Sequence, residues 1–177
     1  ADTGRFKNLD GNVIDTYGDE LVTNGDFNSS DISNWFASSG GIYGIERSML
    51  KVYGASGDAS YGVKYQIPSE KGKAYTLNVN VLNEDSYEIG IGKDAATIND
   101  IYYSTYSEAG KQTISFIATS TTVNIFIRSM VANVSYYIDN ISVKEVTTVD
   151  LTNHIPEVQV QDQATNGLVV QSSVNAG

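Results

Sequence analysis

The sequence predicts an all-β fold, a sandwich or jelly roll of two antiparallel sheets, on three observations. Of the 177 residues, 12 are Tyr, 16 are Gly and only 2 are Pro, a composition that favours strands joined by tight turns. Apolar and polar residues alternate with period two in one segment after another, as in strands with one buried face. No segment repeats apolar residues at helical spacing over three turns. Short strands of this kind bury one face of each sheet against the other.

The alternation is clearest in six segments of the middle of the chain. In one of them Tyr75, Leu77 and Val79 share a face, and Thr76 and Asn78 share the other. The six predicted strands are 60–67, 74–82, 87–93, 112–119, 122–129 and 135–146. Weaker strand candidates are 20–23, 36–38, 43–46 and 50–52. Residues 94–106 are expected to form one long connection, and loops of that length are more often functional or mobile than inert.

Three zones differ in composition. Residues 1–19 are polar and carry an Asp10-Gly11 turn signal. Residues 20–146 hold nearly all the predicted strands, and residues 147–177 contain no Lys or Arg. We therefore expect one domain at 20–146 with extended arms at both ends. The second arm has short apolar runs at 158–160 and 168–170; these could pair with neighbouring subunits as added strands, or the arms could be disordered linkers.

Composition excludes several classes of function. The net charge of −10 disfavours nucleic acid and anionic membrane surfaces as partners, because both need a basic face. No run of about 18 apolar residues exists, so no membrane insertion is expected. The sequence has no Cys, and His154 is its one His. Thiolate metal sites, Cys nucleophiles and His-based catalytic sites are therefore not expected.

A carboxylate pair could still hydrolyse a glycoside, but none of the 21 acidic residues lies in a recognisable catalytic block. We predict a protein that is not an enzyme.

Two motifs go beyond a generic strand pattern. The first is LVTNGDF at 21–27, followed by Trp35, and the second is YYIDNISVKEV at 136–146. With KGKAYTLNV at 71–79 and QTISFIATS at 112–120 between them, they resemble carbohydrate-binding modules of families 4, 9 and 22. The resemblance covers residues 20–146. It implies a jelly roll of the kind appended to glycoside hydrolases and also found in phage tail and virion proteins, one that binds sugar without cleaving it.

The resemblance also implies two roles for particular positions. A single Trp just after the first strand, here Trp35, is a core residue in such modules rather than a sugar platform. A structural calcium ion commonly lies near the first and last strands, and the matching positions are Asp26, Asn28 and Asp139. Asn28 stands where the family commonly has an acid, which removes one negative charge from a site that needs several anionic oxygens. The alternative is that Asp26 and Asp139 only accept hydrogen bonds within turns.

A sugar site needs aromatic faces for the ring and polar planar groups for the hydroxyls. The alternation predicts a polar face that could supply them, with Gly90 and Gly92 letting a ligand approach the backbone. Its members are Lys64, Gln66, Asn78, Asn80, Glu88, Asn124, Phe126 and Arg128. The three tyrosines of the predicted long loop, Tyr102, Tyr103 and Tyr106, could stack on a sugar ring or contact a neighbouring chain. The alternatives are an ordinary solvated sheet face, with Phe126 and the tyrosines packed under or within the loop.

Two functions are therefore expected from the sequence. In the first, the domain binds glycans without catalysis, displayed on an extracellular or virion surface. In the second, the same fold is a structural or decorating protein whose arms, residues 1–19 and 147–177, join it to neighbouring subunits and which has no sugar site.

Overall fold

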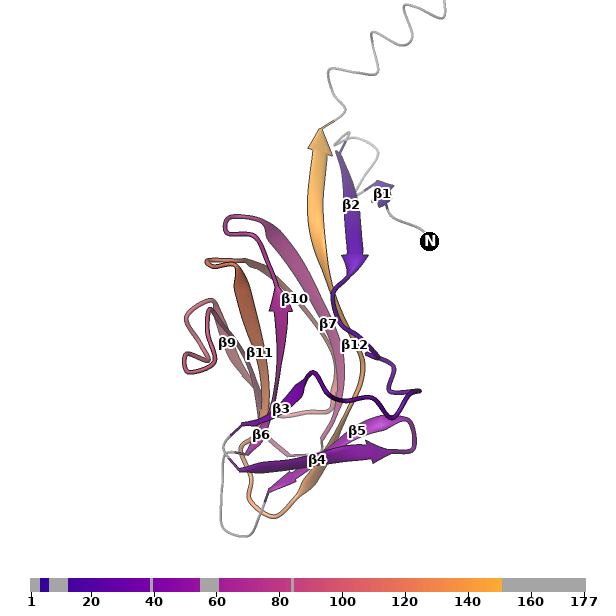
Figure 1. The fold of residues 1–177 in the computed structure, drawn as a ribbon, viewed down its shortest axis with the longest axis vertical. Coiled ribbons are helices and arrows are strands. Elements are labelled where there is room, and N and C mark those ends of the chain that lie inside the picture. The colour runs from indigo at the N-terminus through magenta and orange to yellow at the C-terminus, as the bar shows by residue number, and fades with distance from the viewer. Residues whose placement is uncertain (1–3, 7–12, 39, 55–60, 84, 151–177) are drawn as a thin grey trace, which may run out of the picture. The chain divides into compact units, whose positions relative to one another are not determined.

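The computed structural model describes residues 4–6, 13–38, 40–54, 61–83 and 85–150 (Figure 1). Every regular element within these residues is a β-strand. No helix in this part of the chain has the length and hydrophobicity needed to cross a membrane. The chain divides into two compact units. We call residues 19–146 the sandwich unit, and residues 1–18 with 147–177 the terminal unit.

The first sheet of the sandwich unit, called the β7 sheet, has the strand order β4-β5-β12-β7-β10. Its strands are β4 (Gly41–Glu46), β5 (Met49–Gly54), β12 (Ser135–Asp150), β7 (Ala74–Leu82) and β10 (Gly110–Ile117). All four neighbouring pairs are antiparallel. The strand predicted at 74–82 is found with those bounds.

The second sheet, called the β11 sheet, has the order β3-β6-β11-β8-β9. Its strands are β3 (Trp35–Ser38), β6 (Gly62–Pro68), β11 (Thr122–Ser129), β8 (Tyr87–Gly92) and β9 (Tyr102–Tyr106). These pairs are also antiparallel, and Figure 1 shows the two sheets as two layers. The predicted all-β sandwich of two antiparallel sheets is confirmed.

The core lies between the two sheets, and β7 shows how the alternation builds it. Tyr75, Leu77, Val79 and Val81 are buried, whereas the residues between them are partly exposed. Because successive side chains of a strand point to opposite faces, one face of β7 is apolar and the other is polar. Trp35 is also a core residue, as the resemblance implied: it is 2% exposed.

The segment predicted as a strand at 20–23 is instead the start of a turn. Strand β2 (Val13–Glu20) ends where that segment begins, and Asn24 and Phe27 have positive φ angles. This turn packs on β12, where the Ile141 N–H donates to the Gly25 carbonyl at 3.0 Å. A Cβ on Gly25 would lie 2.0 Å from the Ile141 carbonyl oxygen. The close approach explains why the turn needs glycine at this position.

Strand β12 is irregular opposite this turn. Its pairing with β7 shifts between Asp139 and Ser142, which makes a β-bulge, and Asn140 has a φ of 50°. An extra residue in one strand bends it and turns the neighbouring side chains. The bulge and the Gly25 turn therefore bring the LVTNGDF and YYIDNISVKEV motifs into contact, although more than a hundred residues separate them in the sequence.

The described part of the terminal unit consists of paired strands. Strand β1 (Gly4–Phe6) is antiparallel to β2, and β2 lies next to β12. The buried Asp15 carboxylate accepts a hydrogen bond from the Thr148 hydroxyl at 2.9 Å. The Asp10-Gly11 turn signal, His154 and the apolar runs at 158–160 and 168–170 lie outside the described residues.

Candidate functional site

The structure divides the predicted polar face between two sheets. Asn78 and Asn80 lie on the outer side of β7, in the β7 sheet. The other six members lie in the β11 sheet: Lys64, Gln66, Glu88, Asn124, Phe126 and Arg128. The two outer faces of a sandwich point in opposite directions. The eight residues therefore do not form one site.

The part of the outer face of the β11 sheet around Gly90 and Gly92 is covered by the chain itself. A Cβ on Gly90 would lie 2.1 Å from the Ile98 carbonyl oxygen, and one on Gly92 would lie 1.4 Å from the Thr97 carbonyl oxygen. The backbone that approaches these glycines is thus the β8–β9 loop rather than a ligand. Phe126, the neighbour of Gly90 on β11, is 2% exposed, and Asn124 is also buried.

Three of the predicted residues form a polar cluster around the buried Glu88 on the same face. Glu88 is 2% exposed. Its carboxylate pairs with the Arg128 guanidinium and accepts a hydrogen bond from the Tyr103 hydroxyl. This hydrogen bond raises the pKa of Tyr103, because the carboxylate favours the protonated phenol. The cluster joins β8, β9 and β11. Its polar groups form their ion pair and hydrogen bonds mainly with one another.

The three tyrosines predicted in a long loop lie instead on a strand, β9. Tyr102 and Tyr106 point inward and pack on the core, with their hydroxyls 2.8 Å apart. Tyr106 also stacks on Tyr87 at a centroid distance of 5.2 Å, and burial raises the pKa of Tyr106 far above its usual value. Only Tyr103 of the three is well exposed, at 46%.

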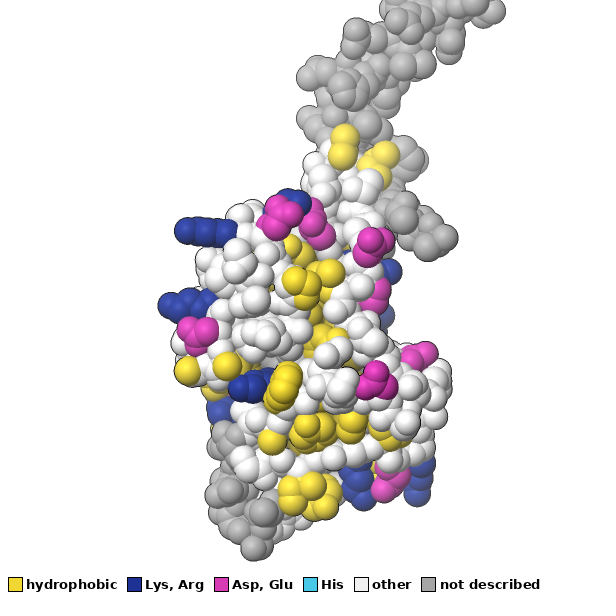
Figure 2. Space-filling view, viewed as in Figure 1, with side chains coloured by type: hydrophobic (Ala, Val, Ile, Leu, Met, Phe, Trp, Pro, Cys, Tyr) yellow, Lys and Arg dark blue, Asp and Glu magenta, His cyan; other side chains and the backbone are white. Residues whose placement is uncertain are grey.

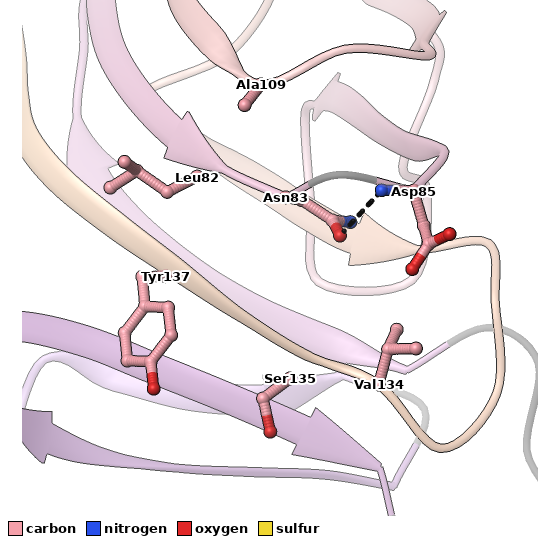
Figure 3. Close-up of a pocket in the computed structure, with 7 residues that line it drawn as sticks. All are labelled: Leu82, Asn83, Asp85, Ala109, Val134, Ser135 and Tyr137. Carbon is pink, nitrogen blue, oxygen red and sulfur yellow. Dashed lines mark hydrogen bonds between the residues drawn. The ribbon is translucent and has the colours of Figure 1, made fainter.

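The opposite face of the sandwich unit, the outer side of the β7 sheet, carries a pocket of about 500 Å³ (Figure 3). The end of β7, the segment before β10 and the start of β12 form its walls. Its lining residues are Leu82, Asn83, Asp85, Ala109, Val134, Ser135 and Tyr137. A concave site with apolar walls and a few polar groups is the usual form of a small-ligand site.

Asn83 gives this pocket an unpaired hydrogen-bond donor. Its side chain is 3% exposed, and its Oδ1 accepts the Asp85 N–H at 3.1 Å. Because Oδ1 is the acceptor, Nδ2 is the group that remains, and it has no hydrogen-bond partner among the described residues. A buried donor without a partner is destabilising. A ligand oxygen that came within hydrogen-bond distance of Nδ2 would remove that cost.

Tyr137 supplies an aromatic ring that is held in place. It lies on β12 between Leu82 of β7 and Lys51 of β5 in the sheet register. Its hydroxyl donates to Glu46 at 2.8 Å, and Glu46 also pairs with Lys51 at 2.9 Å. These contacts hold the tyrosine hydroxyl at the β4–β5 side of the pocket. The charge of Glu46 is balanced by Lys51.

Exposed apolar side chains continue from the pocket across β5 and β4. Tyr53 pairs with Ser135 on one side and with Ile42 on the other, and both Tyr53 and Ile42 are exposed large hydrophobic residues. Figure 2 shows hydrophobic side chains gathered over β4 and β5. The pocket therefore opens beside further apolar area that a longer ligand could cover.

The carboxylates predicted to bind calcium make local hydrogen bonds. Both carboxylate oxygens of Asp26 accept hydrogen bonds from Asn28, and both of Asp139 accept from Asn140. In the described part of the chain no three acidic or His side chains surround one point. A cation would therefore depend on backbone and amide oxygens as well. Calcium at Asp26, Asn28 and Asp139 stays a prediction.

Removal of calcium tests this prediction directly. A cation present at about a hundred times its dissociation constant stabilises the folded state by about 2.7 kcal/mol. We therefore expect EDTA to lower the melting temperature by about 5–10 °C, and added calcium to restore it. The Asp139→Asn variant should melt at the same temperature with and without EDTA. An EDTA-independent melting temperature of the unaltered chain would count against the site.

Comparison with known proteins identifies the fold. No protein-family model matches the sequence, and no curated protein matches it. Among solved structures, a family 4 carbohydrate-binding module (CBM4) superimposes with a TM-score of 0.51 and 19% identity, covering 70% of this chain and 98% of the module. A mutant of the family 29 module CBM29-2 gives 0.53 and 14%, covering 74% and 91%. The chain has the jelly-roll fold of carbohydrate-binding modules.

The same jelly-roll fold occurs within larger proteins. A region of the enzymatically active domain of tailspike protein 4 of bacteriophage CBA120 matches with a TM-score of 0.55 and 16% identity. The alignment covers 71% of this chain and 21% of the tailspike chain. Since all these identities are low, the comparisons establish the fold, and the choice of site depends on the residues described above.

Proposed function

We propose that the sandwich unit is a non-catalytic glycan-binding module whose ligand lies in the Tyr137 pocket. The observation that carries this proposal is the buried, unpaired Nδ2 of Asn83 in a pocket that also contains an aromatic ring. A sugar combines hydroxyls, which can satisfy such a donor, with apolar C–H faces that pack on aromatic rings. The carbohydrate-binding-module fold supports the same function.

The acidic residues of the pocket support binding rather than hydrolysis. Asp85 is the one acid among the described residues that line it. Glycoside hydrolysis normally uses two carboxylates on either side of the scissile bond. Glu46, the acid bonded to Tyr137, is already paired with Lys51. The pocket is thus equipped to hold a sugar, and we propose no catalytic residue in it.

A glycan array probed with the full chain tests the proposal, and paired tyrosine variants locate the site. Tyr137→Ala is expected to weaken binding at least tenfold, or about 1.4 kcal/mol, because it removes the aromatic wall of the pocket. Tyr103→Ala is the matched control, since Tyr103 is an exposed tyrosine on the opposite sheet. Circular dichroism should confirm that both variants fold. Loss of binding in Tyr103→Ala alone would place the site on the β11 sheet instead.

A second candidate function is assembly through the chain ends. The described part of the terminal unit consists of β1, the start of β2 and the end of β12. Among the described residues β1 pairs with β2 alone, so its other edge could pair with a strand of a neighbouring subunit. The tailspike likeness supports display on a virion or other extracellular surface. A failure to bind any glycan, together with a mass in solution well above that of one chain, would favour this function.

A further inference from the structure

We infer that the Asn83–Asp85 end of the pocket selects a sugar hydroxyl and rejects a sugar carboxylate, so that the module binds neutral glycans and discriminates against uronic acids. This inference rests on the proposed function and names the chemical class of its ligand. Two polar residues that follow the end of β7, Asn83 and Asp85, line this end of the pocket (Figure 3).

The first group is a donor with no partner. Asn83 Nδ2 is buried, and the Asp85 N–H fixes the orientation of the amide by donating to Oδ1. The ligand atom that reaches Nδ2 must therefore accept a hydrogen bond. Hydroxyl, ether and carboxylate oxygens all meet this requirement, so Asn83 alone does not select among them.

The second group is an acceptor. Asp85 is half-buried in the wall of the same pocket and takes part in no ion pair among the described residues. An ionised carboxylate only accepts hydrogen bonds. A ligand hydroxyl can accept from Asn83 and donate to Asp85, whereas an ether oxygen can only accept. A ligand carboxylate can only accept and is also repelled by the charge of Asp85.

Asp85 is the charged group with the largest electrostatic effect on a ligand in the pocket, because the other charges nearby are paired or exposed. Glu46 and Lys51, behind Tyr137, form a pair and cancel each other. Lys111 lies on the outer side of β10, two residues beyond Ala109, and pairs with Asn80 in the register. It is exposed, so water and salt weaken its effect. The lining of the pocket therefore carries one net negative charge among the described residues.

The test uses matched neutral and acidic probes. The probes are β-1,4-linked gluco-, manno- and galacto-oligosaccharides, and the same oligosaccharides oxidised at C6 to uronates. Calorimetric titration of the full chain is expected to show at least about tenfold tighter binding of the neutral form. High salt should reduce this ratio by screening the repulsion. In Asp85→Asn the ratio is expected to fall to about threefold or less, since the charge is gone while the shape is kept.

Glu108→Gln is the matched control. It removes one negative charge from an exposed residue next to Ala109 but outside the pocket lining, so the ratio should stay as in the unaltered chain. Equal binding of neutral and oxidised forms would overturn the inference and leave the proposed function standing. A neutral preference that survives both Asp85→Asn and high salt would overturn the role of Asp85. Binding of no probe in either form would overturn the inference and the proposed function together.

Discussion

Replacing Glu88 with Gln is expected to lower the free energy of unfolding by about 3 kcal/mol. Glu88 is almost completely buried, and its carboxylate pairs with Arg128 and accepts the Tyr103 hydroxyl. Glutamine has a similar shape but no charge, so the Arg128 guanidinium, whose side chain is only 18% exposed, would remain without its counter-charge. Urea unfolding at neutral pH measures the difference.

Two variants distinguish the buried pair from charge effects in general. Glu70 pairs with Lys73 at the surface, where its side chain is 69% exposed, and Glu70→Gln should cost less than about 0.5 kcal/mol. The double variant Glu88→Met with Arg128→Met removes both charges, and it should recover much of the lost stability. A Glu88→Gln variant as stable as Glu70→Gln would show that the cluster contributes little.

Replacing Trp35 with Ala is expected to cost about 3–5 kcal/mol. The ring is buried between two others, 5.0 Å from the Tyr65 centroid and 5.8 Å from that of Phe27, so the change opens a large cavity in the core. Trp35→Phe should cost much less, because it retains an aromatic ring and the indole Nε1 has no hydrogen-bond partner among the described residues to lose. Thermal and urea unfolding measure both effects.

The neighbouring Phe36 provides the control for this prediction. It follows Trp35 on β3 but points outward and is one of the exposed large hydrophobic residues. Phe36→Ala should change the free energy of unfolding by less than about 1 kcal/mol. Trp35→Phe should also leave glycan affinity unchanged. A stable Trp35→Ala variant that no longer binds a glycan would mean that Trp35 is a sugar platform after all.

Much of the fold could be predicted from the sequence because burial follows the period of the strand. The segment 74–82 alternates cleanly, and β7 has those bounds. The segment 20–23 is apolar enough for a strand, but the chain turns there because the Gly25 backbone packs on Ile141. The segment 102–106 was hidden within a longer polar stretch, where its two inward tyrosines gave too weak an alternation. The first error comes from a tertiary contact that a local pattern does not contain, and the second comes from an alternation too weak to detect.

The candidate site was harder to predict than the fold. Alternation separates inward from outward residues, but it does not say which sheet a strand joins. Asn80 and Gln66 therefore looked equivalent although they lie on different sheets. Asn83 and Asp85 follow the end of β7, where the alternation stops. The one available signal was the Tyr136-Tyr137 pair: adjacent tyrosines in a strand must point to opposite faces, so one of them had to lie outside the core.

The loop above Gly90 and Gly92 has a consequence for how this protein can evolve. Every substitution of a glycine adds a Cβ, and at both positions the Ile98 or Thr97 carbonyl oxygen already occupies that space. The chemistry of the incoming residue therefore matters less than its having any side chain at all. Outward-pointing side chains of the β8–β9 loop face no such limit. Variation can accumulate in the loop while the two positions beneath it stay glycine.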